Sequence, residues 1–170
     1  TIFFFFLSIL AYSPVIAAEP KRAMMLHSFG PFFILLSDYA TVIRSELVRQ
    51  SLWPLDLTEH SLITARFSGD NPEVPFVEYL GALYAKQRLD LIISIGAPAA
   101  AFIQRHREQL FPATPMLLTV VDQRRVQFFA LTPNDAVVAV SINYFGAIEN
   151  ILKVLPDTKN VTVVVGSSPN

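Results

Sequence analysis

Cysteine is absent from the 170 residues, and its absence excludes several kinds of protein. The chain forms no disulfide bond and offers no cysteine that could carry a lipid after cleavage of a leader. Its three histidines, His27, His60 and His106, do not have the spacing of metal ligands. We therefore expect no metal site and no cofactor.

Glycine is scarce as well, with six residues, and none of them belongs to a nucleotide-binding motif. A dinucleotide-binding turn needs closely spaced glycines after the first strand, where this chain has Gly30 alone, and the Gly-Lys-Ser/Thr of a P-loop is missing. Ser94 has Gly96 two residues later but Ile92 two residues earlier, so it does not match a nucleophile elbow. We expect Ser94 to be a core serine bonded to the backbone, and we expect no catalytic residue.

Charged residues make up 16% of the chain, and 13 basic and 14 acidic residues leave a net charge of −1. Because nucleic-acid binding needs a clustered basic face, we expect no nucleic-acid partner. The hydrophobic fraction of 52% is typical of a packed globular domain rather than of a disordered segment.

An uncharged apolar segment occupies residues 1–18 and ends in small residues, Ala17 and Ala18. This pattern is typical of a secretory signal peptide, here without its basic beginning. A membrane anchor is the alternative, which the shortness of the segment and Pro14 disfavour. We therefore expect residues 1–18 to be a truncated signal peptide and the remaining chain to be exported to the periplasm.

The most informative stretch combines an apolar strand, a sharp turn and a helix. Residues 89–95 predict a strand, Gly96-Ala97-Pro98 a turn, and residues 98–110 a helix. Near-continuous apolar strands suit a parallel sheet that is covered on both faces. The helix is expected to begin just beyond the carboxyl end of the strand, where open α/β sheets bind ligands and where backbone N–H groups can hold an anion.

Strand and helix patterns alternate along the rest of the chain and predict an α/β fold with a doubly wound, mainly parallel sheet. The expected strands are 22–29, one within 54–64, 89–95, 116–121, 136–142 and 161–165, and the expected helices are 37–50, 74–88, 98–110 and 145–155.

Several residues at predicted strand ends are candidates for ligand contact. His27 and Ser28 end the first strand, where His27 either contacts a ligand or is structural. Phe29 either stacks on a ligand ring or packs within the protein. Asp122 either accepts a hydrogen bond from a ligand amine or caps the following turn. We interpret residues 123–125 as a solvated surface turn rather than an anion site, which is the alternative.

Four segments agree, in order, with one known family; they are residues 90–100, 114–122, 148–161 and 166–170. On these segments the chain resembles the ABC-transporter substrate-binding proteins of the tryptophan/tyrosine-binding type, which have the two-lobed type I periplasmic fold. Residues 25–29 and 121–126 are more similar to related modules that form the periplasmic sensor part of bacterial two-component histidine kinases.

The resemblance implies a domain organisation. Residues 19–143 correspond to the first lobe of a ligand-binding domain, and residues 144–170 to the crossover helix and first strand of a truncated second lobe. Family members often carry polar side chains in the turn before the proline and three residues after it, where this chain has Ala97 and Ala101. This departure, together with the missing lipid-bearing cysteine, favours a sensor over a transporter receptor.

The resulting expectation is a small-molecule binding domain that captures its ligand between two lobes. The expected ligand-binding residues are Ser28, Phe29, Gly96, Ala97, Pro98 and Asp122 on one wall, and Ser167 and Ser168 on the other. A sensor implies a membrane helix beyond residue 170, and an importer receptor, the alternative, implies an ABC permease as partner. A small exported hydrolase is a third and less favoured reading, because no spacing in the sequence supports it.

Overall fold

The structure, a computed structural model, describes residues 18–30, 33–62, 72–141 and 143–164. The strands are β1 (Lys21–His27), β2 (Leu55–Ser61), β3 (Leu91–Ile95), β4 (Met116–Asp122) and β5 (Ala136–Val140). The helices are α1 (Ile34–Gln50), α2 (Val74–Tyr84), α3 (Ala97–Leu110) and α4 (Tyr144–Val154), with the short 3₁₀ helices η2 (Gln123–Arg125) and η3 (Phe128–Ala130).

The five strands form one sheet in the order β2-β1-β3-β4-β5, and every neighbouring pair is parallel. The first strand therefore lies inside the sheet, with β2 on one side and β3 on the other. This arrangement confirms the predicted α/β fold with a doubly wound, mainly parallel sheet.

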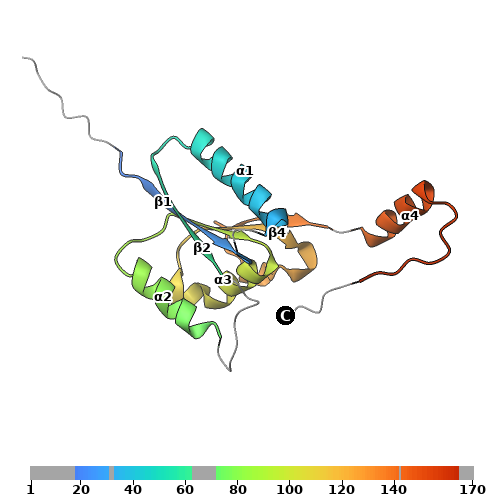
Figure 1. The fold of residues 1–170 in the computed structure, drawn as a ribbon. Coiled ribbons are helices and arrows are strands. Elements are labelled where there is room, and N and C mark those ends of the chain that lie inside the picture. Colours follow the sequence, from blue (N-terminus) through green and yellow to red (C-terminus); the bar gives the residue numbers. More distant parts are fainter. Residues whose placement is uncertain (1–17, 31–32, 63–71, 142, 165–170) are drawn as a thin grey trace, which may run out of the picture.

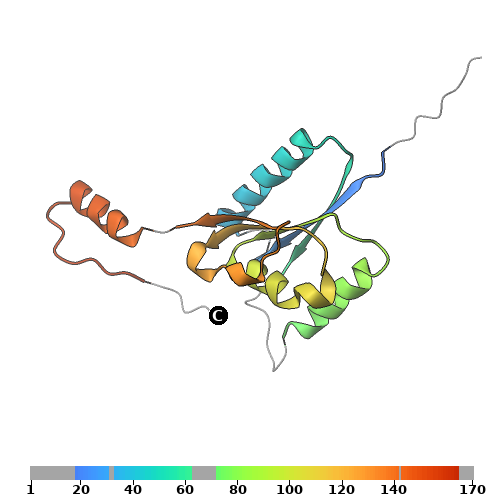
Figure 2. The same ribbon diagram turned by 180° about the vertical axis from the view of Figure 1, so that it is seen from behind.

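Helices cover both faces of the sheet (Figures 1 and 2). Helix α1 lies on one face, where Ala40 packs in a cluster with Met25 and Ile93. Helices α2 and α3 lie on the other, where Leu80 and Phe102 belong to the larger cluster. The central strand β3 is almost completely buried, as its uninterrupted apolar sequence predicts for a strand covered on both faces.

A β-bulge interrupts β4 close to its carboxyl end. Thr119 pairs with Val138 and Val121 with Ala139, so Val120 is an extra residue in β4, and its φ is 53°. Positive φ is uncommon for a β-branched residue. The bulge lets Leu118 and Val121 enter the same core cluster, although residues three apart in a regular strand face opposite sides.

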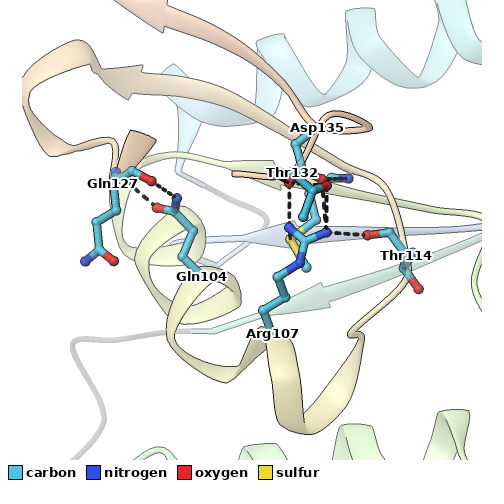
Figure 3. Close-up of polar contacts among 7 residues, drawn as sticks. Gln104, Arg107, Thr114, Gln127, Thr132 and Asp135 are labelled. Carbon is cyan, nitrogen blue, oxygen red and sulfur yellow. Dashed lines mark hydrogen bonds and ion pairs between the residues drawn. The ribbon is translucent and has the colours of Figure 1, made fainter. Parts of the chain in front are cut away.

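A buried ion pair ties the amino end of β4 to α3 and to the turn before β5 (Figure 3). Both guanidinium Nη atoms of Arg107 donate to the Asp135 carboxylate, at 2.6 and 3.2 Å. The same carboxylate accepts from the backbone N–H groups of Met116 and Thr132. These contacts join three segments at the edge of the sheet opposite the carboxyl ends of the strands.

Helix α4 follows β5 and stands apart from the sheet (Figures 1 and 2). None of its residues is buried. Its first turn is capped by Asn143, whose side-chain oxygen accepts from the N–H of Gly146 at 2.9 Å. The helix confirms the predicted segment at 145–155 to within one residue at each end.

The predicted strand at 161–165 is wrong for the part that the structure describes. Residues 161–164 form no strand, and Val163 and Val164 are exposed. A strand needs a neighbouring strand to accept and donate its backbone hydrogen bonds, and none of the described segments lies beside these valines. The valine-rich composition indicates a propensity for β-strand but carries no information about which strand would pair with this segment.

None of the helices in the described ranges is long and apolar enough to cross a membrane. The expected signal peptide lies almost wholly outside those ranges, which begin at residue 18.

Candidate functional site

The topology singles out the carboxyl edge of the sheet between β1 and β3. The chain leaves β1 toward α1 on one face and leaves β3 toward α3 on the other, so the direction of the connections reverses between these two strands. Open α/β sheets bind their ligands at such a point. The two strand ends are bonded together, since the N–H of Ser28 donates to the carbonyl of Ile95 at 3.0 Å.

Gly96 makes the turn from β3 into α3 in a conformation that favours glycine. Its φ is 90°, and a Cβ placed there would lie 2.6 Å from Oγ of Ser28 and 3.1 Å from Cδ1 of Leu36. Its N–H donates to the carbonyl of Thr119 at 3.0 Å, which fixes the turn to β4. The sequence prediction of a tight turn at Gly96 is confirmed.

Ser28 is fully buried beneath this turn. Its hydroxyl donates to the carbonyl of Ile95 at 2.7 Å and accepts from the N–H of Ala99 at 3.0 Å. The side chain therefore satisfies an N–H in the first turn of α3 and connects β1, β3 and α3. Ser28 thus fixes the turn from β3 into α3, and its hydroxyl is already paired within the protein.

Most of the backbone donors at the start of α3 are already in use. Pro98 has no N–H, the Ala99 N–H donates to Ser28, and the Ala100 N–H donates to the carbonyl of Gly96 at 3.1 Å. The Ala97 N–H has no acceptor among the described residues. The expected anion site at this helix start is thus reduced to one backbone donor.

Two aromatic side chains lie in contact near the carboxyl end of β1. Phe29 follows β1 and Phe33 precedes α1, and their ring centroids lie 4.8 Å apart with a tilt of 39°. Phe29 is partly exposed, as are Ala97 and Pro98 at the start of α3. Phe33, with 44% of its surface exposed, was missed by the sequence reasoning because it lies in a segment without a clear periodic pattern.

Asp122 ends β4 at the same edge but is held by its own turn. Its carboxylate accepts from the backbone N–H of Arg124 at 2.9 Å and from the Arg124 guanidinium at 2.9 and 2.6 Å. These hydrogen bonds lower the pKa of Asp122 to about 2. Of the two roles left open for Asp122, the structure shows the cap of the turn.

His27 belongs to a chain of polar contacts on the α1 side of β1. Its Nε2 lies 2.9 Å from the Glu59 carboxylate, which also receives two hydrogen bonds from Arg44. The hydrogen bonds from the Arg44 guanidinium lower the pKa of Glu59. Burial of the carboxylate raises this pKa, and the contact with His27 lowers it further. The ring nitrogen of His27 thus has a structural partner, and Arg44 and Glu59 had not been expected to meet because they lie on different elements.

Ser94 is buried in the core as expected, but its hydroxyl has no hydrogen-bond partner among the described residues. The carbonyl of Ser94 is satisfied, since it accepts from the Thr119 hydroxyl at 2.7 Å. The expected bond from the Ser94 side chain to the backbone is absent from the described part of the chain. Ser94 faces no nucleophile-activating base there.

Two further features of the described residues lie away from this edge. Tyr84 OH contacts Thr58 and His60 on the α2 face, where burial lowers the pKa of His60. An open, largely apolar groove of about 400 Å³ runs between the end of α1 and the start of β2. Its lining residues are Ile43, Glu46, Leu47, Gln50, Ser51 and Leu55.

The described residues contain no group of three or more acidic or histidine side chains suited to a metal ion. Ser167 and Ser168, expected on the opposite wall of the cleft, lie outside the described ranges. Comparisons of the chain with protein-family models, with curated proteins and with solved structures found no match.

Proposed function

We propose that residues 19–143 are one lobe of an exported small-molecule binding domain of the substrate-binding type. The carboxyl edge of the sheet at β1 and β3 forms one wall of its ligand cleft. Phe29, Ala97 and Pro98 contact the ligand there, whereas Ser28 and Gly96 fix the shape of the wall. The second lobe begins with α4 and supplies the opposite wall, including Ser167 and Ser168.

The observation that carries this proposal is the parallel sheet order with its switch point between β1 and β3. The position of α4 adds support, because a helix without buried residues is suited to leave the first lobe and pack elsewhere. The mechanism is closure of the lobes around the ligand, which conveys a signal because the ligand binds the closed state more tightly than the open one.

Within this class, a sensor part of a histidine kinase is favoured over an importer receptor. The 170 residues contain no cysteine that could carry the lipid of a tethered receptor, and the start of α3 offers few groups for an amino-acid carboxylate. The sensor version requires a membrane helix and signalling domains encoded downstream of residue 170. An open reading frame that ends without a membrane helix, beside permease and ATPase genes, would instead identify the importer receptor.

A thermal-shift screen tests the binding function itself. In the complete ligand-binding region encoded by the gene, a ligand at a hundredfold excess over its Kd should stabilise the fold by about 2.7 kcal/mol. The 170-residue chain should respond weakly, because it lacks most of the second wall. A tight, saturable complex with the 170-residue chain would contradict the two-lobed mechanism.

A further inference from the structure

The turn between α1 and β2, residues 51–54, exposes two large apolar side chains. Leu52 is exposed by 87%, and Trp53, the single tryptophan of the chain, is exposed by 51%. Hydrogen bonds fix the turn that carries them. The Ser51 N–H donates to the carbonyl of Leu47 at 3.0 Å, and the Ser51 hydroxyl contacts both the carbonyl and the N–H of Trp53. The fold therefore holds both apolar side chains outward on a defined backbone.

This turn lies at the amino edge of the sheet, opposite the carboxyl edge where we place the ligand wall (Figure 1). The carbonyl of Pro54, at the end of the turn, accepts a hydrogen bond from the Lys21 N–H at the start of β1, at 2.8 Å. The chain enters β1 here from residues 1–18, which are uncharged and mainly apolar. Both interpretations of that segment, a signal peptide and an anchor, place it in a lipid bilayer. The turn is thus close to the point where a membrane-inserted segment joins the fold.

Charged side chains lie around the turn, but each cation is accompanied by a carboxylate. Arg49 pairs with Glu46, and Lys21 pairs with Asp90. The Arg49 and Lys21 side chains are exposed by 66% and 48%, and exposed pairs of this kind contribute little to stability. Because the charges are balanced, attraction to an anionic membrane is weak. A contact with lipid at this edge depends mainly on the apolar side chains.

A tryptophan beside a leucine suits the boundary between lipid headgroups and acyl chains, because the indole is apolar and its N–H still finds acceptors there. We propose that the amino edge of the sheet rests on a lipid bilayer, into which Leu52 and Trp53 insert. Val48, exposed by 63% near the end of α1, adds apolar surface next to them. In this orientation the carboxyl edge faces away from the membrane and stays accessible. The contact is separate from ligand binding and does not depend on it.

The single tryptophan makes a test specific to this turn. The 170-residue chain is mixed with phosphatidylcholine vesicles, and with vesicles whose brominated acyl chains quench tryptophan fluorescence on contact. We expect the Trp53 emission to shift to shorter wavelength and to be quenched by the brominated lipid. Replacing half of the lipid by phosphatidylglycerol should change the quenching by less than about twofold, because the charges at this edge are balanced. Residues 1–18 contain no tryptophan, so their own insertion adds nothing to the signal.

Two matched substitutions locate the contact. Leu52→Ser should lower the ratio of lipid-contacting to free turn by about threefold to tenfold, because a leucine is lost from the contact. Leu35→Ser is the control, since Leu35 is exposed by 72% on the same helix. It lies at the other end of α1, which has 17 residues and is therefore about 25 Å long. Quenching of Trp53 in Leu35→Ser should equal that in the wild type.

Four results would overturn the proposal. Short-wavelength emission without vesicles would show that the chain itself or a second copy covers Trp53. Absence of quenching, whether or not the chain sediments with the vesicles, would show that the turn stays in water. Quenching that requires phosphatidylglycerol would assign the contact to charge, and equal losses in Leu52→Ser and Leu35→Ser would show that it is not specific to this edge. The thermal-shift screen of the complete region decides the proposed function separately.

Discussion

Ser28 and Ser94 are both completely buried serines, yet the structure gives them opposite energetic roles. The Ser28 hydroxyl makes two hydrogen bonds, whereas the Ser94 hydroxyl has no partner among the described residues. Ser28→Ala leaves the Ala99 N–H buried and unpaired, so the free energy of unfolding should fall by about 1–3 kcal/mol.

Ser94→Ala is the matched control for this change. It removes an unpaired buried hydroxyl, so the free energy of unfolding should stay the same or rise by up to about 1 kcal/mol. Urea denaturation of the two variants measures the difference. Equal destabilisation by both substitutions would contradict the roles assigned to the two hydroxyls.

Gly96 and Ser28 should also be energetically coupled. Gly96→Ala places a side chain at φ 90° and 2.6 Å from the Ser28 hydroxyl, so we expect a loss of at least about 1–2 kcal/mol. Removing that hydroxyl relieves the closest contact, so the double variant Gly96→Ala/Ser28→Ala should be more stable than the sum of the single changes predicts. Additive effects in urea denaturation would show that the two residues do not share one contact.

The sequence predicted the position of these residues better than their roles. Gly96 was identified correctly because its turn is local and follows from its neighbours in the chain. The partners of the Ser28 hydroxyl lie 67 and 71 residues away, so the role of Ser28 became visible only in the fold. For Asp122, the sequence left open whether the carboxylate contacts a ligand or caps the following turn. Its hydrogen bonds to Arg124 in the structure show the cap.

Among the elements, α3 is fixed to β4 and to the turn before β5 by the Arg107–Asp135 pair. The Asp135 side chain is completely buried, so Arg107→Leu would leave an uncompensated carboxylate and should cost about 3–5 kcal/mol in stability. Arg105→Leu is the control, because Arg105 pairs with Glu73 at 44% side-chain exposure and should cost at most about 1 kcal/mol. Similar losses in both variants would contradict the role of the buried pair.

The Arg107–Asp135 pair should also affect how the free energy of unfolding changes at acidic pH. Burial raises the pKa of Asp135, but the hydrogen bonds from Arg107, Thr132 and Met116 outweigh it and lower the pKa overall. A lowered folded-state pKa stabilises the fold above the unfolded value of about 3.9, and this contribution is lost as the pH falls through the folded-state value. Unfolding free energies measured from pH 5 downward should therefore fall less steeply in Arg107→Leu than in the wild type. A parallel pH dependence would argue against the pair.

Helix α4 should be the least stable of the helices in the 170-residue chain. It has 11 residues and buries none of them, and isolated helices of this length are marginal in water. We expect its amides to exchange hydrogen at close to unprotected rates, while those of β1 and β3 are the most protected. Hydrogen exchange measured by NMR checks this order, and strong protection of α4 would show that it packs on this lobe.

At the scale of the whole molecule, the fold class followed from the alternation of apolar strands with amphipathic helices. That pattern is local and periodic, so it predicted the elements and a parallel sheet. The bulge at Val120 and the polar contacts of Arg107 and His27 depend on distant segments, so no local sequence pattern indicated them. The valines at 161–164 had strand propensity, but the partner that a strand requires is not encoded in the strand itself.

The central claim is that the carboxyl edge between β1 and β3 forms a wall of the ligand site. Hydrogen exchange of the complete ligand-binding region, with and without a compound that stabilises it in the thermal-shift screen, tests this most directly. We predict that the ligand slows amide exchange at residues 28–30, 96, 97 and 99. Slowed exchange confined to the groove between α1 and β2, around Leu47 and Leu55, with no change at the carboxyl edge, would contradict the claim.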